Sequence, residues 1–212
     1  MKAFIFDMDG VIVDTQGLHS QASLEAMAAF GMESTLEEAL EYAGTARGTT
    51  YREIAKKRGI EVPVEEISQL KDRLFTEAVE KADLEPIRGI PALLKKLRAM
   101  GIPTAIASSS SEEFIAFIVD RLHIRAYFDE LLSGQKLPKS KPDPAIYRLA
   151  AQALGVRPRD CVVLEDAALG AEAAKAAGMF CIGYRNPSSG NQDLSRADLV
   201  IDNIEDIPVE TL

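Results

Sequence analysis

Three aspartates lie within eight positions near the start of the chain. The stretch FIFDMDGVIVDT, residues 4–15, contains Asp7, Asp9 and Asp14 directly after an apolar run. In an extended conformation the side chains of residues i and i+2 share a face, so Asp7 and Asp9 are predicted to point together. Neighbouring carboxylates repel one another unless a counter-ion is present. A hard divalent cation with oxygen ligands, namely Mg²⁺, suits this pattern.

Polar residues also follow three other apolar runs, and these are the serines 108–111, Lys141 in a basic loop (136–144), and the pair Glu165 and Asp166. Ligands bind at the carboxyl ends of the strands in an open α/β sheet, so all these groups are expected on one rim. Glu165 and Asp166 would add carboxylates to the Mg²⁺ site. No Cys-x-x-Cys or Cys/His spacing in the sequence supports a zinc site.

Together these residue types indicate phosphoryl transfer, in which catalysis is mostly positioning and charge neutralisation. An ionised Asp7 beside the metal can attack an electrophile. Asp9 can protonate the leaving oxygen and later deprotonate water. The Ser108 hydroxyl can donate to a phosphoryl oxygen, and Lys141 offers a compact positive charge to phosphate and to Asp7.

The elements that position these groups are predicted from the spacing of apolar residues. Short strands are expected at residues 2–6, 103–108, 130–133, 161–164, 179–184 and 197–201. Helix-period segments alternate with them at residues 90–100, 112–122, 143–154 and 167–177. Alternating strands and helices predict an α/β fold with a doubly wound parallel sheet.

One long segment departs from this alternation. Its helix-period stretches cover residues 17–30, 35–43, 48–58 and 64–82. We therefore predict a core domain of residues 1–14 and 85–212, and an all-helical cap domain of residues 15–84 inserted after the first strand. Asp14 is expected to cap the first of these helices. The segment RNPSSGNQD (185–193) is turn-rich and polar, and is predicted to be an exposed loop.

Composition narrows the possible partners and setting. The 212 residues carry a formal net charge of -9, so the chain has no long-range attraction for nucleic acid or anionic membrane. No apolar run approaches the roughly 20 residues needed to span a bilayer, and the N-terminus does not resemble a signal peptide. The two cysteines, Cys161 and Cys181, are predicted to be buried hydrophobes. A cytoplasmic monomer is expected.

The motifs resemble those of the haloacid dehalogenase superfamily over essentially the whole chain. FDMDGVIVDT resembles its first motif, Asp-x-Asp-Gly followed by Val or Thr. Ser108 in IASSS resembles the second motif, Lys141 in SKPDP the third, and Glu165–Asp166 in VLEDAALGAEAAKAAGM the fourth. The helical insertion resembles the small-cap subclass that includes β-phosphoglucomutase and many sugar-phosphate phosphatases.

This resemblance implies specific roles at the matching positions. Asp7 would form an aspartyl-phosphate, and Asp9 would be the acid/base and also give a backbone carbonyl to Mg²⁺. Glu165 and Asp166 would complete the metal site. True dehalogenases lack the second Asp of the first motif, so the presence of Asp9 argues against a C–Cl substrate.

Four residues are candidates for binding substrate: His19, Arg47, Ser109 and Ser110. By the resemblance, His19 matches a mutase His at the substrate end of the site, and Arg47 matches an Arg that grips the second phosphate. A helix-surface His and a surface salt bridge are the alternatives. Ser109 and Ser110 either favour an anion at the start of a helix or form only its first turn.

A phosphatase and a mutase would share Asp7 and Asp9, so residues that bind a second phosphate distinguish them. The mutase has lysines where this chain has Ala43 and, by a weaker alignment, Thr76. We therefore favour a phosphatase of a small phosphorylated metabolite, a sugar phosphate, with β-phosphoglucomutase as the alternative. A non-catalytic phosphate-binding or signalling module is a third possibility, but it would need neither the cap nor Asp9.

Overall fold

The computed structural model describes residues 1–41 and 48–212, and these form two compact units. The core unit comprises Met1–Asp14 and Leu84–Leu212, and the helical unit comprises Thr15–Asp83. Arg47, which the sequence suggested for substrate binding, lies outside the described residues, as does Ala43.

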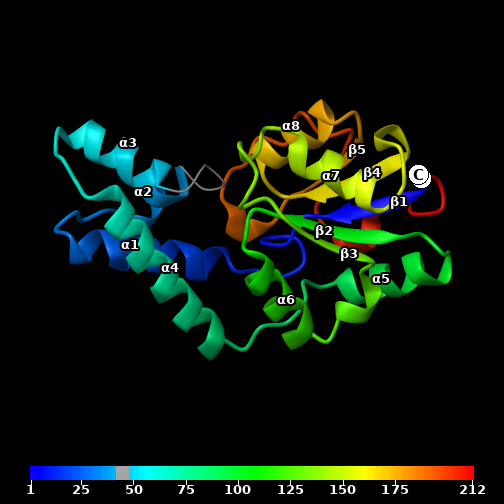
Figure 1. Ribbon diagram of the computed structural model, residues 1–212, viewed down its shortest axis with the longest axis horizontal. Coiled ribbons are helices and arrows are strands. Elements are labelled where there is room, and N and C mark those ends of the chain that lie inside the picture. The colour runs from blue at the N-terminus through cyan, green and yellow to red at the C-terminus, as the bar shows by residue number, and fades with distance from the viewer. Residues whose placement is uncertain (42–47) are drawn as a thin grey trace. The chain divides into compact units, whose positions relative to one another are not determined.

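A six-stranded parallel sheet forms the centre of the core unit (Figure 1). Its strands are β1 (Ala3–Phe6), β2 (Thr104–Ser108), β3 (Glu130–Ser133), β4 (Cys161–Glu165), β5 (Phe180–Tyr184) and β6 (Leu199–Ile201). Their order is β3-β2-β1-β4-β5-β6, so the first strand lies between β2 and β4. The predicted doubly wound α/β fold is confirmed.

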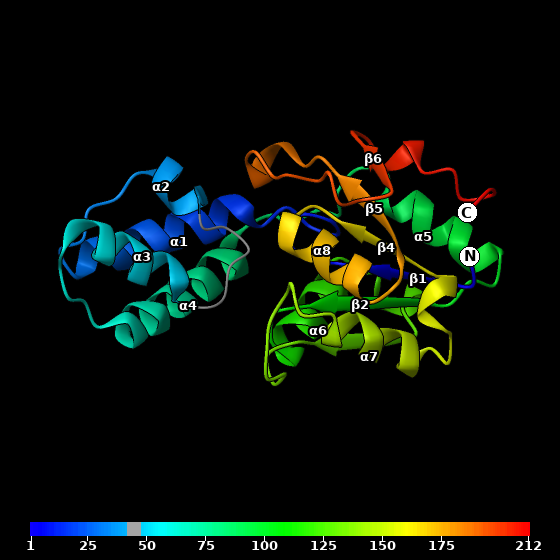
Figure 2. The same cartoon turned by 90° about the horizontal axis from the view of Figure 1, so that it is seen from above.

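Helices cover both faces of this sheet (Figures 1 and 2). They are α5 (Ile90–Ala99), α6 (Glu112–Arg121), α7 (Ala145–Ala153) and α8 (Ala168–Ala176). Short 3-10 turns complete the connections: η1 (Arg125–Tyr127), η2 (Pro158–Asp160), η3 (Pro187–Ser189) and η4 (Ile204–Asp206). In Figure 1, α7 and α8 lie on one side of the strands, and α5 and α6 lie on the other.

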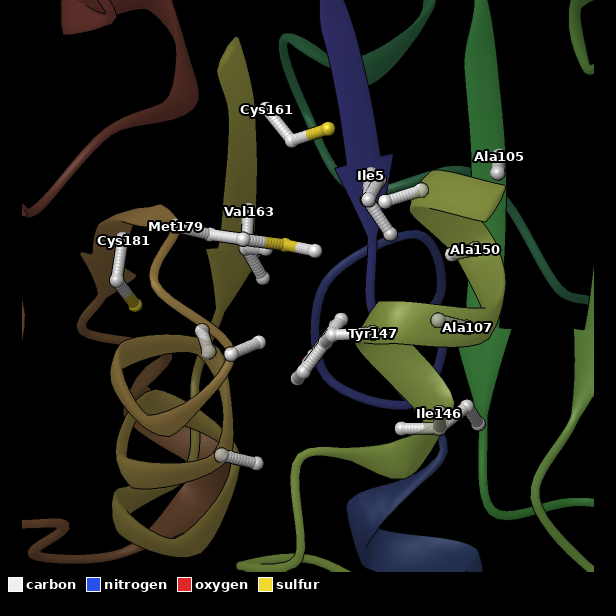
Figure 3. Packing of buried hydrophobic residues seen from close by; sticks show 14 of the residues in the cluster. Ile5, Ala105, Ala107, Ile146, Tyr147, Ala150, Cys161, Val163, Met179 and Cys181 are labelled. Atoms are coloured by element: carbon white, nitrogen blue, oxygen red, sulfur yellow. The ribbon is translucent and has the colours of Figure 1, made fainter. Parts of the chain in front are cut away.

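Small residues allow α7 and α8 to approach the sheet closely. Their buried positions include Ala150 on α7 and Ala173 on α8, in one cluster with Ile5 of β1 and Val163 of β4 (Figure 3). The central strands β1, β2 and β4 are buried over their whole length and are largely apolar, as expected where a parallel sheet is covered on both faces. Cys161 and Cys181 are free thiols buried in this cluster, as their apolar surroundings in the sequence predicted.

The helical unit has its own apolar core, to which Met27, Ile54 and Ile67 contribute. Its helices are α1 (Gln16–Ala29), α2 (Leu36–Glu41), α3 (Thr49–Arg58) and α4 (Val64–Lys81). Gly59 ends α3 in the left-handed conformation with φ +65°, a position where glycine avoids the strain of a side chain. Among the described residues, no helix is both long enough and apolar enough to cross a bilayer.

Candidate active site

The carboxyl ends of β1, β2 and β4 bring the predicted polar residues to one edge of the sheet. Asp7 directly follows β1, and its amide donates to the Leu164 carbonyl of β4 at 3.0 Å. Ser108 and Glu165 are the last residues of β2 and β4. Asp7, Ser108, Glu165 and Asp166 are all buried at this edge.

The chain turns sharply after Asp7. The Met8 carbonyl accepts the amides of Ile12 and Val13 at 2.8 and 3.2 Å, so the motif is a compact loop rather than an extended segment. Gly10 has φ +87°, and a Cβ at this position would lie 2.0 Å from the Asp166 Oδ2. Glycine is therefore needed here both for the turn and for the close approach of the Asp166 carboxylate.

Lys141 bridges two of the carboxylates. Its Nζ lies 2.5 Å from Asp7 Oδ1 and 2.6 Å from Glu165 Oε1, and its side chain is 9% exposed. Burial disfavours the charge, but the two carboxylates outweigh burial and raise the pKa of Lys141 above its ordinary value. Lys141 is therefore a shielded, permanent cation next to the predicted nucleophile.

Glu165 is held by four donors. Its Oε1 accepts from Lys141 and from the Tyr147 hydroxyl at 2.7 Å, and its Oε2 accepts the amides of Asp166 and Ala167 at 3.0 and 3.1 Å. Tyr147 is completely buried on α7 and was not among the candidates from sequence. In Figure 3 it lies among apolar side chains, which explains why helix periodicity gives it the appearance of a core residue.

Asp7, Glu165 and Asp166 form a carboxylate cluster whose ligand oxygens lie within 4.8 Å of one another. Burial raises the pKa of Asp7 well above its ordinary value. Burial, together with the neighbouring Glu165 charge, raises the pKa of Asp166 to about 7. One ammonium therefore leaves this cluster short of positive charge, and its all-oxygen donor set fits Mg²⁺.

The four serines 108–111 occupy different environments. The buried Ser108 hydroxyl accepts the Ser110 amide at 3.1 Å, and the Ser110 hydroxyl donates to Asp9 Oδ2 at 3.1 Å. Ser111 caps α6 by accepting an amide, and Ser109 is exposed. The structure therefore brings Ser110 to the predicted acid/base, a contact that spacing along the chain could not reveal.

Within the helical unit, the His19 side chain packs against two residues of α4 and does not simply lie on a helix surface. Its Nδ1 lies 2.9 Å from Lys71 Nζ, and its ring stacks on Phe75 with centroids 3.7 Å apart. The alignment with the mutase placed Thr76 where that family has a lysine, and it did not identify Lys71. The spacing of Lys71 and Phe75, four residues apart on one helix face, is the signal that could have found it.

One expectation from the sequence is incomplete and another is wrong. Six of the nine residues in the segment 185–193 are exposed, as predicted, but Asn186 and Ser189 are only 6% and 4% exposed. Asp14 does not cap α1, whose N-cap is Thr15 without a side-chain cap bond; Asp14 instead accepts the Ser188 hydroxyl at 2.5 Å. Both differences arise because contacts between distant segments override local turn chemistry.

Comparison with known proteins identifies relatives along most of this chain. The family profile of haloacid dehalogenase-like hydrolases matches residues 1–178. A CBBY-like protein of Arabidopsis thaliana is 43% identical over 143 residues, which is 66% of this chain and 44% of that protein. This chain therefore spans less than half the length of the Arabidopsis relative.

Two bacterial relatives are matched over nearly their whole length. The β-phosphoglucomutase of Bacillus subtilis is 33% identical over 228 residues, covering 100% of this chain and 94% of that protein. The fructose-1-phosphate phosphatase YqaB of Escherichia coli is 30% identical over 182 residues, covering 85% and 95%. The crystal structure of CbbY from Rhodobacter sphaeroides in complex with phosphate has a TM-score of 0.86 at 27% identity, covering 98% of this chain and 96% of that one.

Proposed function

Because this chain belongs to the haloacid dehalogenase-like hydrolase family, we propose that it is a Mg²⁺-dependent phosphatase of a small phosphorylated metabolite, a sugar phosphate. The observation that carries the proposal is the Lys141 ammonium, which lies between Asp7 and Glu165 in the buried carboxylate cluster. Positive charge at this place favours the ionised form of Asp7, the form that an attacking carboxylate requires.

The proposed reaction has two steps, transfer of the phosphoryl group to Asp7 and its hydrolysis by water. An Asp7 oxygen attacks the phosphorus atom, the bond from phosphorus to the sugar oxygen breaks, and Asp9 gives its proton to that leaving oxygen. Water then attacks the phosphorus of the aspartyl-phosphate, Asp9 takes a proton from the water, and Asp7 leaves as a carboxylate. The products are the free sugar and inorganic phosphate.

Neighbouring hydroxyls orient the reacting groups. The Ser110 contact supports a fixed orientation for the Asp9 carboxylate. Because the Ser108 hydroxyl oxygen already accepts the Ser110 amide, its proton is directed elsewhere and can be donated to a phosphoryl oxygen. Both contacts assign the serines to positioning and charge stabilisation, the two main contributions to phosphoryl transfer.

The carboxylate cluster would hold the metal ion. Asp7 and Asp166 are the principal ligands in this proposal, and Glu165 contributes while holding Lys141. When bound, Mg²⁺ supplies positive charge to the phosphoryl oxygens. The phosphate bound to the structurally similar CbbY, and the sugar phosphate in the name of the YqaB relative, support the proposed substrate class.

A mutase is the second candidate, and one observation favours it. The helical unit has a cation in Lys71, which contacts His19. The absence of lysine at positions 43 and 76 had suggested that the helical unit lacks a cation for a second phosphate. A second phosphate group needs such a charge, since an ionic hydrogen bond contributes about 1.5–3 kcal/mol. The identity to B. subtilis β-phosphoglucomutase agrees with this alternative.

One assay separates the two activities. Purified protein with Mg²⁺ is given β-glucose 1-phosphate and a trace of glucose 1,6-bisphosphate, and inorganic phosphate and glucose 6-phosphate are measured separately. Phosphate release without glucose 6-phosphate supports the phosphatase and leads to a panel of other sugar phosphates. Glucose 6-phosphate without net phosphate release identifies a mutase. Neither product across the whole panel, with Mg²⁺ present, contradicts both proposals.

A further inference from the structure

The loop that follows β5 carries two buried polar residues that the proposed chemistry does not use. Residues 185–193 are polar and turn-rich, yet Asn186 and Ser189 are 6% and 4% exposed. Buried polar side chains require specific partners, because an unpaired one costs stability. The partners of both residues lie in the metal-binding end of the core unit.

Ser189 contacts the carboxylate cluster directly. Its hydroxyl donates a short hydrogen bond to Asp166 Oδ2, between two buried groups 23 residues apart in the chain. The same oxygen faces Gly10, where an added Cβ would lie only 2.0 Å away. Asp166 Oδ2 is therefore enclosed on one side by the β1 loop and bonded on another by Ser189, so the rotation of the carboxylate is fixed.

Asn186 attaches the same loop to the backbone at Gly10. Its Nδ2 donates to the Gly10 carbonyl at 3.0 Å, across 176 positions of sequence. Its Oδ1 accepts the Ser188 amide at 2.9 Å, which shapes the loop itself. Since Gly10 follows Asp9 immediately, Asn186 links the loop after β5 to the loop that carries the proposed nucleophile and acid/base.

Gln192 attaches the loop to the helix that begins after Asp166. Its Nε2 donates to the Ser189 carbonyl at 3.2 Å, and its Oε1 accepts the Ala168 amide at 3.1 Å. The position of Ser189 is thus set by contacts at both of its sides. A hydroxyl held in this way can fix a carboxylate, whereas a mobile surface hydroxyl could not.

We propose that Ser189 and Asn186 are positioning residues that hold Asp166 and the β1 loop ready for Mg²⁺. The inference rests on the proposed function, because it takes the carboxylate cluster as the metal site. Carboxylates that repel one another would otherwise rotate apart, and the Ser189 bond keeps Asp166 facing its partners before the ion arrives. Groups that orient metal ligands in this way typically change metal affinity 10–100-fold when they are removed.

The test measures metal binding to the resting full-length protein, without substrate. Free Mn²⁺ is counted by electron paramagnetic resonance and displaced by Mg²⁺, for the wild type, Ser189→Ala and Ser188→Ala. Ser188 is the matched control, because its hydroxyl bonds Asp14 on the surface and not the cluster. We expect Ser189→Ala to weaken Mg²⁺ binding about 10–100-fold. Ser188→Ala should stay close to the wild type.

Further measurements separate positioning from simple stability. Ser189→Thr retains the hydroxyl and should recover most of the affinity, and excess Mg²⁺ should restore most of the turnover of Ser189→Ala. Unfolding temperatures in EDTA report the fold of each variant. If Ser189→Ala does not fold, Gln192→Ala decides the matter, because it loosens Ser189 while keeping its hydroxyl. Weakened Mg²⁺ binding by folded Gln192→Ala supports the inference.

The contrary outcomes are distinct. If the wild type binds Mg²⁺ and folded Ser189→Ala binds it equally well, the inference is wrong and the proposed phosphatase stands. Equal binding by Gln192→Ala would overturn it in the same way. If the wild type binds neither Mn²⁺ nor Mg²⁺, the metal-dependent function itself is wrong, and the inference falls with it.

Discussion

Two buried tyrosines show how differently the core and helical units use polar groups. The Tyr147 hydroxyl in the core unit lies 2.7 Å from Glu165, within a network that contains Lys141 and Asp7. The Tyr51 hydroxyl in the helical unit lies 3.4 Å from the neutral Ser23 hydroxyl. Groups in a charged network depend on one another, so a change in the core unit should cost more than the same change in the helical unit.

The largest effect should follow from removing the carboxylate of the proposed nucleophile, Asp7, or of the proposed acid/base, Asp9. Asp7→Asn and Asp9→Asn should each lower turnover by at least about 10⁴-fold, since each removes a group that reacts directly. The fold should remain, because an amide in place of the buried Asp7 carboxylate relieves repulsion within the cluster. Turnover numbers and circular dichroism test this. Retained activity in Asp7→Asn would defeat the nucleophile assignment.

The second-largest effect is expected from adding a methyl group at Gly170, next to the Glu165 carboxylate. A Cβ at Gly170 would lie 1.7 Å from Glu165 Oε1, so Gly170→Ala must displace the carboxylate that holds Lys141. Misplacement of about 1 Å near reacting groups lowers rates on the order of 10²-fold, and we expect such a loss in kcat.

Gly17→Ala is the matched control in the helical unit. Gly17 also lies in a helix, and a Cβ there would meet nothing within 4 Å. This change should leave kcat unaltered and stabilise the protein by at most about 1 kcal/mol. Equal losses of kcat in the two variants would mean that the crowding at Gly170 is not the cause.

The two tyrosine hydroxyl contacts, one to Glu165 and one to Ser23, give the third prediction. Tyr147→Phe removes a donor to a buried carboxylate, and should lower the free energy of unfolding by about 1.5–3 kcal/mol. Ser23→Ala removes the 3.4 Å contact to the Tyr51 hydroxyl, which joins two neutral groups, and should cost less than about 1 kcal/mol. Chemical denaturation of both variants measures the difference. If Ser23→Ala costs as much as Tyr147→Phe, the contrast between the two units is wrong.

The smallest effect is expected from the cation of the helical unit. For a phosphatase, Lys71→Met should change kcat/KM toward a sugar monophosphate by less than about 10-fold, since the single phosphate of that substrate is held by the core unit in this proposal. Steady-state kinetics test this directly. A much larger loss, confined to reactions that require a bisphosphate, would favour the mutase and give the helical unit an equal part in the chemistry.

The sequence predicted the parts of the site that strand ends determine. Apolar runs followed by Asp7, Ser108, Glu165 and Asp166 were enough to place these residues on one rim, since parallel strands share a carboxyl edge. The motifs that contain them also indicated the family, which the match over residues 1–178 confirms. The doubly wound α/β fold follows from the same alternation, whereas the strand order was not predicted from it.

The residues that support the site could not be predicted in this way. Tyr147 has the helix spacing of a core residue, and Ser189 stands in a segment typical of exposed turns. Their roles depend on partners 18 and 23 positions away, and that of Asn186 on a partner 176 positions away. Local pattern carries no information on such pairs, because the packing of α7 against the sheet and the neighbouring positions of β1, β4 and β5 in it bring these residues together.

The central position of β1 has a consequence for how the protein emerges from the ribosome. β1 pairs with β2 and β4, so its second partner is synthesised only with Cys161–Glu165. At about 5–20 residues per second, the first strand waits roughly 8–30 s, during which the whole of Thr15–Asp83 is completed. In refolding, the β1 amides should therefore gain protection from hydrogen exchange together with those of β4, after those of α1 and α4.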